Sequence, residues 1–109
     1  MPIFRLQPYL IGMRQMGIDE VGMAKIELEI VANPNHPMIK ELRGVRKARI
    51  SRPGMGKRGG GRVIYYVPIG TDAFYMMAAY AKNEQDDLST EQRRRILRVL
   101  ENIKKVRGR

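Results

Sequence analysis

The stretch Val45–Val67, VRKARISRPGMGKRGGGRVIYYV, contains the strongest strand signals in the sequence. Its end, Arg62–Val67, is rich in β-branched and aromatic residues, and its beginning, Val45–Ile50, alternates between apolar and basic residues. Pro68–Asp72 has the composition of a turn and leads into a third strand, from Ala73 to about Ala81. Three strands joined in this order by hairpins predict an antiparallel sheet.

The residues before this stretch predict one short strand and two helices. Met1–Leu6 fits a strand, and Pro8–Met16 fits a weak helix that ends at a glycine. The second helix is expected at about Glu20–Ala32, because Asp19 is a suitable N-cap and apolar residues recur at helical spacing up to an Asn-Pro-Asn stop. Alternation within Lys25–Ile30 leaves a strand as the competing interpretation.

The C-terminal part predicts a third helix. Ser89 and Gln92 have the spacing of a capping box, and Ile96, Leu100 and Ile103 continue it as an amphipathic helix to about Val106. These elements together predict the α+β class. A chain of 109 residues has room for one modest core, so residues 1–109 are expected to form a single domain.

The charge of the chain is large and unevenly placed. With 21 basic and 11 acidic residues its formal net charge is +10, which favours nucleic acid as partner, and next an anionic membrane or an acidic protein segment. From Leu42 to Thr71 there is no acidic residue, and the basic ones are Arg43, Arg46, Lys47, Arg49, Arg52, Lys57, Arg58 and Arg62. The absence of cysteine excludes disulfides and a cysteine nucleophile, and it suits a reducing cytoplasm. Short apolar pieces at the N-terminus predict neither export nor a membrane span.

Three of these basic residues are expected to meet on one face of the sheet. Alternation puts Lys47 and Arg49 on the same face, and pairing of the first two strands brings Arg62 beside them. Three cations with no interposed carboxylate repel one another unless an anion lies among them, so they predict a phosphate-binding patch. Helices are expected to cover one face of the sheet, and the charges then mark the other as the binding surface. A merely solvated face is the alternative.

The glycine-rich segment Arg52–Arg62 is expected to join the two strands as a loop that includes Lys57 and Arg58. Glycines let backbone amides approach a phosphate, and the cations neutralise it, so the segment suits a sugar-phosphate clamp. A flexible hairpin with solvated charges is the alternative. The Walker spacing is absent. Gly56–Gly59 matches the GxxG loop of KH domains, but that loop joins helices, whereas the flanks here predict strands.

Further polar groups follow the third predicted strand. Tyr80 would stack on a base, and Lys82 would donate a proton or stabilise charge. A core position for Tyr80, and a role of Asn83 in capping the chain reversal, are the alternatives. His36, the single histidine, lies between two prolines in a predicted loop and is assigned no role. With scattered carboxylates and no cysteine, no metal site is expected.

Four blocks of sequence stand out: Leu42–Ile50 (LRGVRKARI), Gly56–Tyr66 (GKRGGGRVIYY), Tyr80–Glu84 (YAKNE) and Asp87–Ser89 (DLS). In this order and spacing they resemble the HigB-type branch of the RelE toxin superfamily, and the likeness extends over roughly residues 32–106. It implies a compact α+β fold, with an antiparallel sheet of three to four strands packed against two N-terminal helices and a C-terminal helix. It further implies a ribosome-dependent endoribonuclease that cleaves mRNA in the ribosomal A site without metal or other cofactor, and a cognate antitoxin that neutralises it.

The resemblance also implies roles for individual residues. In such enzymes the 2′-hydroxyl of the message attacks the adjacent phosphate, so the protein removes that proton, stabilises charge on phosphorus and protonates the leaving 5′-oxygen. Lys47 and Arg49 match the two strand cations that stabilise charge, with Lys47 the better group for proton transfer, and Arg62 would grip the scissile phosphate. The expected RNA contacts are Arg46, Arg52, Lys57, Arg58, Tyr80 and Asn83.

The sequence departs from the family pattern at its fourth block. RelE enzymes proper have an Arg and a downstream Tyr where this chain has Asn83 and Ser89, which leaves the general acid or base open, with Lys82 as the substitute. Two other classes also stay open: a non-catalytic RNA- or ribosome-binding module or degenerate toxin, and a DNA-binding regulator. The latter is disfavoured because no helix-turn-helix pair precedes the basic last helix, so operator DNA is expected only through a helix-turn-helix antitoxin. Ribosomal RNA is a further expected partner.

Overall fold

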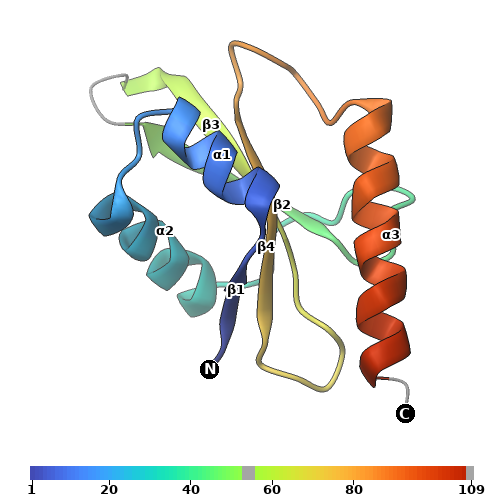
Figure 1. Ribbon diagram of the computed structural model, residues 1–109. Coiled ribbons are helices and arrows are strands. Elements are labelled where there is room, and N and C mark those ends of the chain that lie inside the picture. Colours follow the sequence, from blue (N-terminus) through green and yellow to red (C-terminus); the bar gives the residue numbers. More distant parts are fainter. Residues whose placement is uncertain (53–55, 108–109) are drawn as a thin grey trace.

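The computed structural model describes residues 1–52 and 56–107, with side chains for residues 1–52 and 60–106, and shows an α+β domain (Figure 1). The strands are β1 (Ile3–Arg5), β2 (Arg46–Arg52), β3 (Gly56–Tyr66) and β4 (Phe74–Ala81), and the helices are α1 (Gln7–Gln15), α2 (Glu20–Ala32) and α3 (Thr90–Arg107). Each predicted element is present, and the interpretation of Lys25–Ile30 as a strand is wrong.

The four strands form one sheet in the order β1-β4-β3-β2. The hairpin pairs β2–β3 and β3–β4 are antiparallel, as expected. The first strand is different, because β1 runs parallel to β4, with Ile3 opposite Phe74 and Arg5 opposite Met76. The sheet is therefore mixed, and its outer strand β2 lies far from the chain's first residues.

The glycine-rich segment forms most of the first half of β3, which corrects the expectation of a loop over Arg52–Arg62. Gly61 pairs with Ile50 of β2 and with Ala81 of β4. A Cβ atom on Gly61 would lie 2.5 Å from the Met16 sulfur and 3.0 Å from the Tyr80 carbonyl oxygen. Glycine at this position thus lets neighbouring backbone and the end of α1 approach the strand closely.

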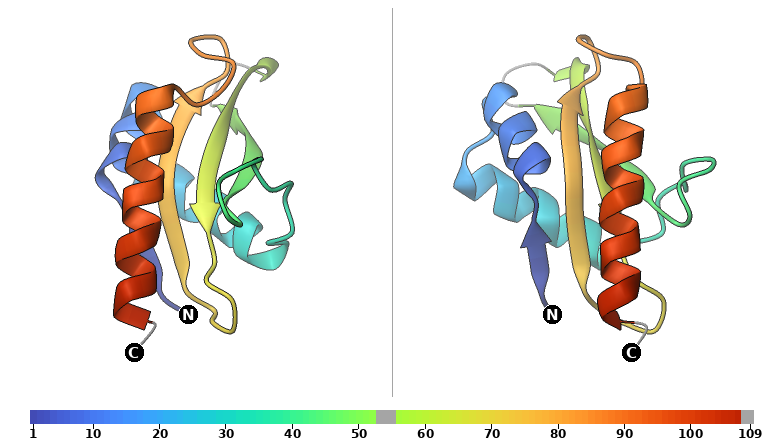
Figure 2. Two further views of the ribbon diagram at one scale, coloured as in Figure 1. Left: turned by 90° about the vertical axis from the view of Figure 1, so that its right-hand side faces the viewer. Right: turned by 45° about the vertical axis from the view of Figure 1, so that its right-hand side comes forward.

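Helices cover both faces of the sheet, whereas the sequence predicted one open face. Figure 2 shows α3 on one side, and α1 with α2 on the other. The α1–α2 side is a core that includes Tyr9, Met13 and Val63, and the α3 side is a second core that includes Ile64 and Leu100. Any binding site on the sheet must therefore lie beside a helix.

Both helix caps predicted from the sequence are confirmed. Asp19 Oδ1 accepts a hydrogen bond of 2.9 Å from the Gly22 amide at the start of α2. At the start of α3, the Ser89 amide donates to Gln92 Oε1 at 2.8 Å, and the Gln92 amide donates to Ser89 Oγ at 3.1 Å. No helix within the described ranges has both the length and the apolar character needed to cross a bilayer.

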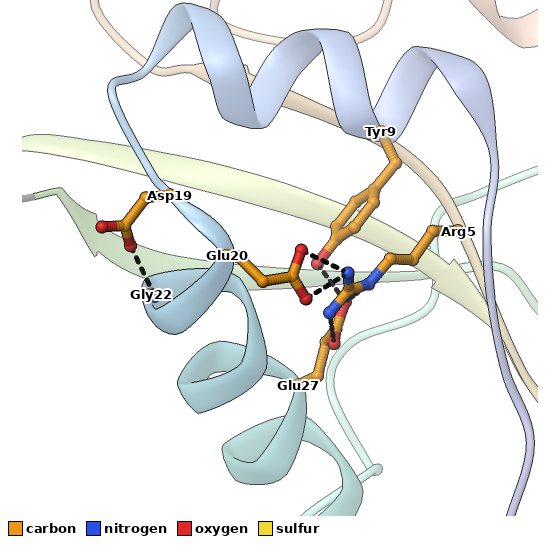
Figure 3. Close-up of polar contacts among 6 residues, drawn as sticks. All are labelled: Arg5, Tyr9, Asp19, Glu20, Gly22 and Glu27. Atoms are coloured by element: carbon orange, nitrogen blue, oxygen red, sulfur yellow. Dashed lines mark hydrogen bonds and ion pairs between the residues drawn. The ribbon is translucent and has the colours of Figure 1, made fainter.

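A polar network ties β1, α1 and α2 together (Figure 3). Glu27 of α2 is buried, and its carboxylate accepts from Arg5 at 2.7 and 2.8 Å and from the Tyr9 hydroxyl at 2.7 Å. Arg5 also donates to the exposed Glu20 at 2.7 Å. Burial, and then the hydrogen bond to Glu27, raises the pKa of Tyr9 above its usual value. The network fixes the N-terminal strand against the two helices.

Candidate functional site

Lys47, Arg49 and Arg62 come together on the α3 side of the sheet. Arg49 of β2 lies directly opposite Arg62 of β3, and Lys47 points to the same face two residues earlier. They line a hollow of about 350 Å³ together with His36, Pro37 and Asp86. We call this the basic hollow. The convergence predicted from strand alternation is confirmed, although the hollow lies on a face that α3 also covers.

Arg62 is a buried cation with little to balance it. It is 8% exposed, and Nη1 donates to the Gly61 carbonyl oxygen at 3.0 Å. No carboxylate within the described part of the chain lies within ion-pair distance of it. A guanidinium has five N–H donors, so most of its hydrogen-bonding capacity is left for a ligand. Burying such a charge is costly unless an anion pairs with it.

Two carboxylates adjoin the basic hollow, which corrects the expectation that none lies among the cations. Asp86 lines it, and Asp87 Oδ1 lies 4.0 Å from Lys47 Nζ, while Asp87 Oδ2 lies 3.3 Å from Arg93 Nη2. The Leu88 amide, which donates to Asp87 Oδ1 at 2.8 Å, is the main cause that lowers the pKa of this carboxyl, and Lys47 and Arg93 lower it further. The carboxylates of the loop before α3 therefore partly neutralise the charge of Lys47, but none of them pairs with Arg62.

His36, to which the sequence assigned no role, also lines the basic hollow. Its Nδ1 lies 2.8 Å from the Tyr65 hydroxyl, and its carbonyl oxygen accepts a hydrogen bond of 2.6 Å from Arg46 Nη1. The Lys47 amide donates to the Pro37 carbonyl at 3.0 Å, which attaches the loop to the edge of β2. In the sequence, the prolines that flank His36 were the one local signal of a fixed loop. The contact with Tyr65 could not be predicted, because Tyr65 is distant in the sequence.

Tyr80 is a core residue, so the predicted stacking of a base on its ring is wrong. It is 5% exposed and packs in the core beneath α3. Its hydroxyl has no hydrogen-bond partner in the described part of the chain. Burial raises the pKa of this hydroxyl and Asp87 adds to the rise, while Arg62 and Arg93 act in the opposite direction.

Other residues predicted to bind RNA lie outside the basic hollow. Arg46 shares the opposite face of β2 with Ala48, and its guanidinium holds the His36 carbonyl instead. Arg52 Nη1 lies 3.4 Å from Asn83 Oδ1, so these two residues contact each other at the far end of β2. Lys82 is exposed in the turn after β4 and is not among the residues that line the hollow.

The predicted clamp residues Lys57 and Arg58 have side chains outside the described part of the structure, so their expected role stays a prediction. Within the described ranges, no group of three or more His, Asp and Glu residues has the arrangement of a metal site. The candidate site is thus a cationic hollow whose lining includes one histidine and one carboxylate, with a second carboxylate, Asp87, beside Lys47.

The chain matches a known protein family. A family model described as the RelE toxin of the RelE/RelB toxin-antitoxin system matches residues 39–107. The matched region contains β2, β3, β4 and α3, and therefore all three cations of the basic hollow. His36 lies just before it.

Proposed function

The chain belongs to the RelE toxin family, and from this premise we propose that it is a ribosome-dependent endoribonuclease that cleaves translated mRNA. The observation that supports the proposal best is the buried Arg62 guanidinium, which opens onto the same hollow as Lys47 and Arg49 without a carboxylate partner among the described residues. An RNA phosphate supplies the negative charge that this site lacks.

In the proposed reaction the 2′-oxygen of a nucleotide attacks its own 3′-phosphate, and the bond from phosphorus to the leaving 5′-oxygen breaks. Arg49 and Arg62 stabilise the charge that develops on the phosphate oxygens. Lys47, whose ammonium lies 4.0 Å from Asp87, donates a proton to the leaving oxygen. The reaction yields a 2′,3′-cyclic phosphate and a free 5′-hydroxyl, and it needs no metal.

Family membership implies a cognate antitoxin as partner. We infer that this antitoxin is of the helix-turn-helix type and that the toxin meets operator DNA only through it. The remaining positive charge, including the exposed Arg94 and Arg98 of α3, fits contact with ribosomal RNA around the A site. The proposed place of action is the cytoplasm, where ribosomes translate.

Arg62→Ala tests the proposal, with Arg14→Ala as the matched control. Arg14 is an exposed arginine on α1, on the other side of the sheet from the basic hollow. Induction of the wild-type protein and of Arg14→Ala should arrest growth and create new 5′ ends within translated messages, mapped by primer extension. Arg62→Ala should do neither, while its circular dichroism spectrum stays that of the wild type.

The same experiment separates cleavage from binding alone. Growth inhibition by the wild-type protein without new mRNA ends would show a non-catalytic ribosome-binding module. New ends that persist with Arg62→Ala would remove Arg62 from the site.

A further inference from the structure

The contacts of His36 determine which of its ring nitrogens carries a proton. The Tyr65 hydroxyl has a single proton, and it donates this proton to the Pro34 carbonyl oxygen at 2.8 Å, because a carbonyl only accepts. The same hydroxyl lies 2.8 Å from His36 Nδ1, so in this contact Nδ1 must be the donor. The neutral ring is therefore protonated on Nδ1, and its lone pair is on Nε2.

This lone pair belongs to a residue that lines the basic hollow. Nδ1 is turned to Tyr65, which leaves Nε2 as the ring nitrogen that is free to accept a proton from a ligand. No hydrogen bond joins Nε2 to any part of the described chain. The loop that holds the ring is fixed on two sides, by the bond from Arg46 to the His36 carbonyl and by the bond from the Lys47 amide to the Pro37 carbonyl.

We propose that His36 is the general base of the RNA cleavage, an inference that rests on the proposed function. Nε2 takes the proton of the 2′-hydroxyl as the 2′-oxygen bonds to phosphorus. The bond between phosphorus and the 5′-oxygen breaks, and the Lys47 ammonium protonates that oxygen. His36 ends as imidazolium and Lys47 as amine, and exchange with water restores both, so protons and electrons balance.

Two observations favour His36 over Lys82, the residue that the sequence suggested as acid or base. Lys82 does not line the basic hollow, whereas His36 does. A base also needs a lone pair that is free in the resting enzyme, and the contact with Tyr65 keeps the proton on Nδ1 and the lone pair on Nε2. Tyr65 is thus a positioning residue, since it acts on the reaction only through His36.

His36→Asn tests the base directly. The asparagine amide retains an N–H donor at the place of Nδ1, so the contact to Tyr65 and the loop are preserved, but the acceptor at Nε2 is lost. Cleavage of a defined message should be followed with purified toxin on programmed ribosomes under single-turnover conditions across a range of pH. We expect His36→Asn to lower the cleavage rate by about 100-fold or more, with unchanged affinity for the programmed ribosome.

The pH profile distinguishes a lost base from a damaged loop. The charged and titratable groups around His36 are Arg46, Lys47 and Arg49 from β2, Arg62 and Tyr65 from β3, and Asp86 from the loop before α3. All of these groups remain in His36→Asn. If the cleavage rate of the wild type decreases at low pH and that of the variant does not, the difference reports the imidazole itself. A wild-type rate, or a slower rate with the wild-type profile, would overturn the inference.

Tyr65→Phe tests the positioning role, with Tyr66→Phe as its control in the same strand. Tyr65→Phe removes the hydroxyl that orients the ring but leaves the base, so we expect a rate loss smaller than that of His36→Asn and a retained acidic limb. Tyr66 lies on the α3 side and makes no hydrogen bond to His36 within the described part of the chain, so its variant should cleave as the wild type does. If wild-type toxin cleaves no message, the proposed function fails and this inference with it; if it cleaves and only His36→Asn is without effect, the inference alone fails.

Discussion

A guanidinium buried without a carboxylate destabilises a fold, because the lost hydration of the charge is not repaid. Arg62 is in this position: it is almost wholly buried, and its described hydrogen bond goes to the adjacent Gly61 carbonyl. Nothing in the packing of β3 requires a cation there, since its neighbours Val63 and Ile64 are ordinary core residues. We therefore expect an anionic ligand to neutralise this charge.

Replacing Arg62 with methionine should stabilise the protein while it removes the anion site. Methionine has similar length and no charge, so we expect Arg62→Met to raise the free energy of unfolding by about 1 kcal/mol or more, measured by urea denaturation at low phosphate. Inorganic phosphate should raise the melting temperature of the wild type by binding the native state, and should do so much less for the variant. A variant less stable than the wild type in phosphate-free buffer would show that Arg62 has a structural partner instead.

The position of a side chain could be predicted from the sequence where it follows from alternation within one strand. It could not be predicted where it follows from a contact with a residue far away in the chain. Period two in β2 placed Lys47 and Arg49 correctly, because alternation is a property of the strand alone. The position of His36 in the lining of the hollow was not predicted, because its ring is held by Tyr65, which is 29 positions away in the chain. The carboxylate beside Lys47 comes from the loop before α3, which no local pattern places near β2.

At the scale of elements, the starts of α2 and α3 could be predicted from the sequence, because a helix cap is formed by residues close together in the chain. Asp19 and Ser89 bond amides three residues further along, and both helices begin where these residues predicted. The length of β3 could not be predicted from the sequence, because a glycine-rich sequence usually indicates a loop. At Gly61 the reason for glycine is tertiary: a side chain would collide with Met16 and with the neighbouring backbone.

The network centred on Glu27 predicts that substitution of two glutamates of the same helix lowers the free energy of unfolding by very different amounts. Glu27 is buried and bonds both Arg5 and Tyr9, whereas the side chain of Glu20, which also pairs with Arg5, is 71% exposed. We expect Glu27→Ala to lower the free energy of unfolding by about 3 kcal/mol, because it leaves two polar groups without their partner. Glu20→Ala, the matched control, should cost less than about 1 kcal/mol.

Urea denaturation of both variants measures this difference. An equally small decrease in the free energy of unfolding for both variants would mean that solvent reaches Glu27 and that the network does not fix β1. Loss of β1 alone should leave the β2–β3 pair intact, so binding of phosphate at the basic hollow serves as a second readout of local rather than global damage.

At the scale of the whole molecule, the excess of positive charge is distributed over the surface, but the fold gathers three cations at one place. The parallel pairing of β1 with β4 puts the N-terminal helices on one side of the sheet and leaves β2 as the far edge. On the α3 side, this edge and the loop before α3 enclose the basic hollow. Composition predicted a polyanionic partner, whereas only the topology shows on which face of the sheet the three cations gather.

The dependence of RNA affinity on salt should separate this site from general attraction by a net charge of +10. Each phosphate neutralised on single-stranded RNA contributes a slope of about −0.7 to the plot of log binding constant against log salt concentration. Arg49→Ala removes a cation of the basic hollow, so we expect weaker binding to a short single-stranded RNA and a slope smaller in magnitude by about 0.7. Arg14→Ala lowers the net charge equally but on the opposite side of the sheet, so the slope should stay at the wild-type value. Fluorescence anisotropy titrations at several salt concentrations measure both. An equal decrease for the two variants would mean that RNA is attracted by the overall charge and not held in the basic hollow.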